Sequence, residues 1–94
     1  MHDRRTSKPE YGPTMLRALM GMGHASVDEL MEETLRLMRS RLHPADFEAL
    51  PGGVPRWRRQ AEHMLWGLIE DGYVEESKGS LKLTRRGLDY LSGR

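Results

Sequence analysis

The stretch from Pro55 to Gly72 constrains the fold most, because it carries one unbroken apolar stripe at helical spacing. Counted from Trp57, apolar residues stand at offsets 0, 4, 7, 8, 11 and 12: Trp57, Ala61, Met64, Leu65, Leu68 and Ile69. This spacing is typical of a helix with one buried face. Pro55 suits the first helical turn, where an N–H would be unpaired anyway, and Gly72 suits the C-terminal cap. We therefore expect a helix here, with Trp57 in the core.

Directly after this helix the apolar period changes from 3.6 to 2, which is typical of β-strands. We expect one strand over residues 73–77 and a second over 80–83. Lys78-Gly79 between them suits a two-residue hairpin turn, because glycine readily adopts a positive φ. The sequence therefore predicts a small β-hairpin that follows the central helix.

A last helix is expected from Arg85 to about Leu91, capped by Thr84 and folded back on the core through its leucines. Gly87 lies inside this helix, where glycine costs about 1 kcal/mol relative to alanine. Its presence predicts a close approach of another chain segment at that position.

The first half of the chain reads as helices joined by glycine and proline. Residues 1–10 are polar and without periodicity, and we expect a flexible arm over residues 1–12, whose Arg4, Arg5 and Lys8 either touch phosphates or are solvated. A helix is expected from Pro13 to the glycines at 21–23, and a second from the capping box Ser26–Glu29 to about residue 40. A short helical turn follows at Pro44, anchored by Phe47 and Leu50, before the loop at 50–55.

Composition limits the functional classes. The chain has 94 residues, which is the size of one small domain, and its net charge is only +1. Residues 1–50 carry 7 Lys/Arg and 8 Asp/Glu, and residues 51–94 carry 8 and 6, so the basic excess is confined to the second half. There is no cysteine, no apolar run of membrane-spanning length and no apolar segment of a signal peptide. We expect a cytoplasmic protein without membrane contact.

The order helix, helix, short helix, basic helix, hairpin, helix is that of a winged helix-turn-helix, a mostly α fold with a small β-hairpin wing, which we place at residues 13–94. In this fold the central helix enters the major groove of double-stranded DNA and the hairpin lies beside the backbone. Arginine, glutamine, histidine and lysine are suited to base edges and phosphates. The predicted DNA-binding residues are Arg56, Arg58, Arg59, Gln60, His63, Lys78, Lys82, Arg85 and Arg86.

Particular motifs resemble the N-terminal winged-helix domain of Mrr-type restriction endonucleases. They are the loop Leu50-Pro51-x-Gly53, the pair Arg56-Trp57, the terminal Gly72, and Thr84-x-x-Gly87 after the wing. The sequence departs from the family at His63-Met64, where a Trp-Ala pair is usual, and at Tyr73-Val74, where Leu or Ile usually follows the glycine. The resemblance implies DNA binding, by a small regulator or a DNA-targeting module.

A second reading remains open, in which the domain binds a protein or a second copy of itself and not DNA. Trp66 lies about 180° from Trp57 on the helix, so it is either a partner contact or covered by a neighbouring helix. The four histidines lack ligand-like spacing, and no nucleophile, base and orienting group come together. We expect no enzyme activity, no metal, no cofactor and no small-molecule substrate.

Overall fold

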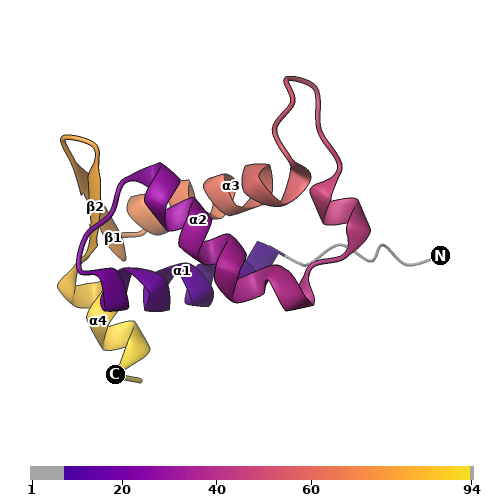
Figure 1. Ribbon diagram of the computed structural model, residues 1–94. Coiled ribbons are helices and arrows are strands. Elements are labelled where there is room, and N and C mark those ends of the chain that lie inside the picture. Colours follow the sequence, from indigo (N-terminus) through magenta and orange to yellow (C-terminus); the bar gives the residue numbers. More distant parts are fainter. Residues whose placement is uncertain (1–7, 94) are drawn as a thin grey trace.

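A computed structural model describes residues 8–93 (Figure 1). Arg4 and Arg5 of the predicted arm lie outside the described residues. The elements, in chain order, are α1 (Lys8–Met22), α2 (Val27–Met38), the 3₁₀ turns η1 (Arg39–Arg41) and η2 (Pro44–Phe47), α3 (Arg56–Glu70), β1 (Val74–Ser77), β2 (Ser80–Leu83) and α4 (Arg85–Leu91).

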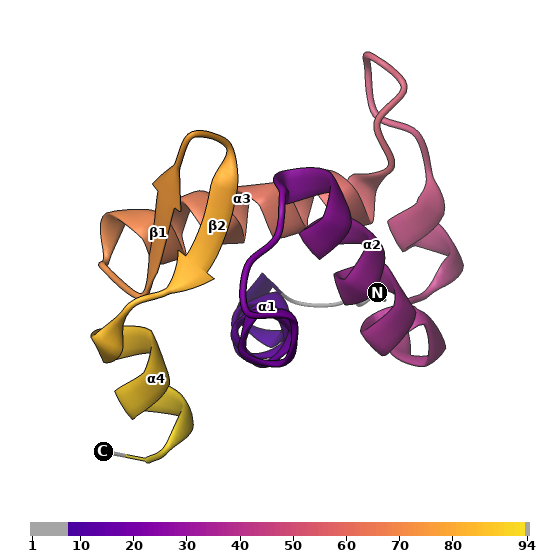
Figure 2. The same ribbon diagram turned by 60° about the vertical axis from the view of Figure 1, so that its left-hand side comes forward.

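The first helix, α1, is the centre of the fold. It contacts α2, α3, β2 and α4, and Figure 2 shows it end-on with these elements around it. Met15, Leu16 and Leu19 on α1 are buried together with Leu30 of α2 and Leu65 of α3. The core is therefore built around a helix that the sequence pattern did not single out.

The predicted start of α1 at Pro13 is wrong, because the helix begins five residues earlier, at Lys8. The side chain of Tyr11 is fully buried, and its hydroxyl donates to Oε1 of Gln60 on α3 at 3.4 Å. Burial of this tyrosine favours the extra helical turn, although Pro13 within the helix lacks an N–H. The domain therefore includes residues 8–12, which the sequence assigned to the flexible arm.

The second helix begins as predicted, with Ser26 and Glu29 forming a reciprocal capping box. It ends at Met38 and passes through η1 and η2 into the loop before α3. Phe47, the predicted anchor of η2, is 42% exposed, whereas Asp46 is fully buried and accepts a hydrogen bond from the His43 backbone N–H. A buried carboxylate that caps the turn replaces the expected apolar anchor.

The hairpin has the predicted two-residue turn, with Lys78 at φ 53° and Gly79 at φ 80°. Its register pairs Val74 with Leu83 and Ser77 with Ser80. Strand β2 is also hydrogen-bonded to the α1–α2 connection, because Ala25 and Leu81 exchange two backbone hydrogen bonds of 3.0 and 2.7 Å. This extra bridge fixes the hairpin to the helical part of the fold.

The last helix is held at its first turn. Thr84 caps it by accepting from the Gly87 N–H at 3.1 Å, and its own hydroxyl donates to the Gly72 carbonyl. A Cβ on Gly87 would lie 2.3 Å from the Tyr73 carbonyl oxygen, which confirms the predicted close approach. Leu88, expected to fold back on the core, is 43% exposed.

The architecture confirms the predicted class, a mostly helical winged helix-turn-helix whose wing is the β1–β2 hairpin. Its third helix, α3, precedes the wing, and the C-terminal end of α3 lies next to the strands of the hairpin (Figure 2). Within residues 8–93, every helix is too short or too polar to span a bilayer.

Candidate nucleic-acid interface

The central helix α3 places its apolar stripe inward as the spacing predicts. Trp57, Ala61, Leu65 and Leu68 are buried along it, and Trp57 is only 6% exposed. Its 15 residues make a rod about 22 Å long. The opposite side of this rod is therefore the surface that α3 offers to a partner.

Three exposed side chains, Arg59, His63 and Trp66, follow one another along this outer side at spacings of four and three residues. These spacings place them on one helical face. Arg59 and His63 have no polar side-chain partner among residues 8–93, and Trp66 is 49% exposed. We call these three residues the outer face of α3.

Two turns project beyond α3 on the side away from α1. Both views show the β1–β2 turn near one end of α3 and the 50–55 loop near the other (Figures 1 and 2). The loop is a closed turn, because the Leu50 N–H donates to the Val54 carbonyl at 2.9 Å and the Arg56 N–H donates to the Glu48 carbonyl at 2.9 Å. The outer face of α3 therefore lies between two ordered projections.

Arg58, one of the predicted DNA contacts, takes part in two ion pairs within the chain. Its Nε donates to Glu62 at 2.9 Å, and its Nη2 donates to Asp28 of α2. Hydrogen bonds to Asp28 and then to Glu62 raise the pKa of the guanidinium above its usual value. Arg58 joins α2 to α3, so its charge is already compensated within the chain.

Arg56 and Gln60 are half-buried beside the first turns of α3. Arg56 Nη2 lies 3.8 Å from Glu48 Oε1, and the Arg56 Nε is buried without a hydrogen-bond partner among the described residues. The Gln60 amide oxygen accepts from Tyr11. Both side chains therefore make contacts at the edge of the core, whereas Arg59, which lies between them in the sequence, is exposed.

On the wing, Lys78 and Lys82 are both exposed. Lys82 Nζ lies 3.2 Å from Glu75 Oε1 on the paired strand. Lys78 stands at the tip and has no polar side-chain partner among residues 8–93. Of the two lysines, Lys78 is thus the more readily available cation.

On α4, both predicted arginines have partners inside the chain. Arg85 Nε lies 3.4 Å from Asp89 one turn further on, although its side chain is 84% exposed. The Arg86 guanidinium lies 4.6 Å from the centroid of the Tyr73 ring and donates to the Tyr73 hydroxyl at 3.3 Å. A cation–π contact of this kind is worth about 0.5–1 kcal/mol at an exposed site.

The nine predicted residues therefore separate into two groups. Arg59, His63 and Lys78 are exposed and unpaired within the described part of the chain, and the other six have partners or are half-buried. Partners such as Asp28 and Glu48 come from distant segments, so no pattern within α3 predicts them. Trp66 is exposed, which excludes the alternative that a neighbouring helix covers it.

Other surface features were missed from the sequence. The exposed Tyr90 ring meets Tyr73 edge-on at 5.6 Å, beside a small apolar hollow, and a groove runs between α1 and α2. The described residues contain no group of three or more His, Asp or Glu side chains placed to hold a metal ion.

Comparisons with protein-family models, with curated proteins and with solved structures found no match to this chain. The class of the protein, a winged helix-turn-helix, thus comes from its own structure, and the resemblance to Mrr-type endonucleases stays a prediction.

Proposed function

We propose that this chain binds double-stranded DNA through the outer face of α3 and the tip of the wing, as a small regulator or DNA-targeting module in the cytoplasm. One observation carries the proposal. Arg59 and His63 are exposed on α3 without a polar partner among residues 8–93, and Lys78 stands in the turn of the wing, one of the two turns that project beyond α3 (Figure 1).

The dimensions support this assignment. A helix with side chains is about 10–12 Å across, and the major groove of B-DNA is about 12 Å wide. Arg59 would then meet a base edge or phosphate, and Lys78 a phosphate beside the groove. The resemblance to the Mrr-type N-terminal domain adds support by analogy.

The small number of unpaired cations sets an expectation for the affinity. Each phosphate neutralised by a cationic side chain contributes about −0.9 to the slope of log affinity against log salt. If Arg59, Lys78 and one further arginine or lysine each neutralise a phosphate, we expect a shallow slope of about −3.

Fluorescence anisotropy with a random-sequence duplex at two salt concentrations tests the proposal. Arg59→Ala should lower the affinity by about 1–3 kcal/mol if Arg59 reads a base, and Lys78→Ala should reduce the salt slope by about 1. Arg17→Ala is the matched control, because Arg17 is an exposed arginine on α1 that also lacks a polar partner within the described residues. Unchanged affinity in both test variants, with the fold retained, would contradict DNA binding by this face.

A protein-binding function is the second candidate, favoured by the 49% exposure of Trp66 on the same face. Tryptophan is enriched at the energetic centres of protein interfaces. Intrinsic fluorescence separates the two candidates. Addition of duplex should quench the wild type more than Trp66→Phe if DNA covers this face. Absence of any binding or quenching at low salt would instead favour a protein partner.

A further inference from the structure

The solvent side of α2 divides into an acidic half and a basic half. Glu29, Glu32 and Glu33 stand in its N-terminal half, and Arg36 and Arg39 follow at its C-terminal end. These charges suit the helix dipole, but that role does not require them to share one exposed side.

Several of these groups are already engaged within the chain. Glu33 binds Arg36 at 2.6 Å, and Glu29 accepts from the Ser26 N–H in the capping box. The side chains of Glu32 and Arg39 are exposed and have no polar partner among residues 8–93. They are seven residues apart, which places them about 10 Å from each other on one side of the helix.

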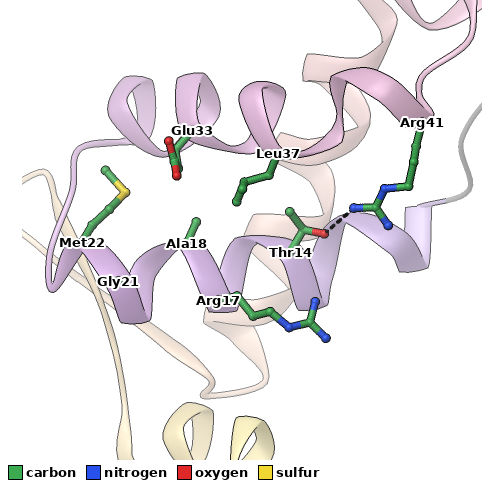
Figure 3. A pocket seen from close by; sticks show the side chains of 8 residues that line it. All are labelled: Thr14, Arg17, Ala18, Gly21, Met22, Glu33, Leu37 and Arg41. Carbon is green, nitrogen blue, oxygen red and sulfur yellow. Dashed lines mark hydrogen bonds between the residues drawn. The ribbon is translucent and has the colours of Figure 1, made fainter.

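An apolar groove between α1 and α2 adjoins this charged surface (Figure 3). Ala18 and Gly21 of α1 line its apolar part, and Arg17, Glu33 and Arg41 also line it. Among the described residues, no atom outside its own helix lies within 4 Å of the Cβ position at Gly21. Met22 and Leu37 flank the groove and are 37% and 38% exposed. Met22 also borders a hollow with Glu29 and Glu32, so it lies beside the acidic half.

We propose that the solvent side of α2 and the adjoining groove bind a second copy of this chain in a two-fold dimer. A two-fold axis across α2 makes the two copies of the helix antiparallel, and each surface then meets an identical surface in reverse. Glu32 of each copy faces Arg39 of the other, and Leu37 of each packs near Met22 of the other.

The distribution of charge on this surface favours a second copy of the chain over other partners. A partner with one sign of charge would match only half of the surface and repel the other half. A second copy in the antiparallel arrangement places Glu32 opposite Arg39 at two symmetric positions, while Arg36, which lies near the two-fold axis, is neutralised by Glu33 of its own chain. The groove uses no residue of α3 or the wing, so the dimer is independent of the proposed DNA contact and is tested without DNA.

The test is sedimentation or light scattering of the whole chain over a wide range of concentration. The mass of the wild type should rise from 10.8 kDa toward twice that value. Glu32→Lys and Arg39→Glu should each weaken self-association by about tenfold, because each places like charges opposite one another at two symmetric positions. Lys78→Glu, a charge reversal on the wing, should leave it unchanged.

Complementation separates this interface from a general loss of structure. An equimolar mixture of Glu32→Lys and Arg39→Glu restores opposite charges at both positions, as does a chain that carries both changes. Both should associate as the wild type does, with helix content checked by circular dichroism. A wild type of constant monomeric mass overturns the proposal. Single variants that associate as strongly as the wild type also overturn it.

Discussion

Helices α3 and α4 carry similar residues but use them differently. Each begins with arginines, contains an internal glycine and has an exposed aromatic residue, Trp66 in α3 and Tyr90 in α4, both 49% exposed. In α4 these groups are occupied: Arg86 lies over the Tyr73 ring, and Gly87 touches the Tyr73 backbone. Helix α4 therefore packs against the junction between α3 and β1 and stabilises it.

In α3, Arg59, Trp66 and Gly67 are left open, although Arg58 is paired. Among the described residues, no atom outside its own helix lies within 4 Å of a Cβ built on Gly67, and Arg59 has no polar partner. The comparison teaches that residue type does not separate structural from binding roles in this chain. The two roles are separated by whether other parts of the fold contact the side chain.

The largest expected effect is on the α4 side. Gly87→Ala should destabilise the fold by about 3 kcal/mol, because the new methyl group would overlap the Tyr73 carbonyl oxygen and backbone would have to shift. Helix propensity alone predicts the opposite sign. Urea denaturation of the variant measures the difference, and a neutral or stabilising result would show that α4 can move away from Tyr73 freely.

The second effect concerns the attachment of α3 to α1. Burial, together with the nearby charges of Asp46 and Glu10, raises the pKa of Tyr11 from 10.0 to about 12. The folded state favours the neutral phenol, so this stabilisation is complete below pH 10 and is lost as pH rises through 12.

The rise of the Tyr11 pKa from 10.0 to about 12 corresponds to at most about 3 kcal/mol of folding free energy. Denaturation midpoints between pH 9 and 12 measure it, with Tyr11→Phe as the control that lacks the ionising group. The wild type should lose more stability than Tyr11→Phe over this range. Equal losses in the two chains would mean that the Tyr11 hydroxyl ionises as easily when folded as when unfolded.

The smallest effect is the counterpart of the first. Gly67→Ala should stabilise the fold by about 1 kcal/mol, because alanine favours the helix and its methyl group meets open space. The same denaturation experiment serves, with the two glycine variants as controls for each other. A loss of stability at Gly67 would remove the contrast between the open side of α3 and the packed side of α4.

Local features were predictable because neighbouring residues determine them. The Ser26–Glu29 capping box, the Lys78-Gly79 turn and the burial of Trp57 are all confirmed. The site was predicted less well. Arg58 and Arg59 are adjacent and chemically identical, yet Arg58 pairs with Asp28, thirty residues earlier in the chain, whereas Arg59 has no polar partner among residues 8–93.

By itself, the sequence determined the order of the elements and the face of α3 that turns inward, since apolar period, caps and turns act over a few residues. Only the tertiary structure decided that α1 begins at Lys8 and that Arg58 is paired while Arg59 is exposed. These outcomes depend on burial of Tyr11 and on ion pairs between separate helices. Such contacts form only when distant segments pack together, so no local pattern encodes them.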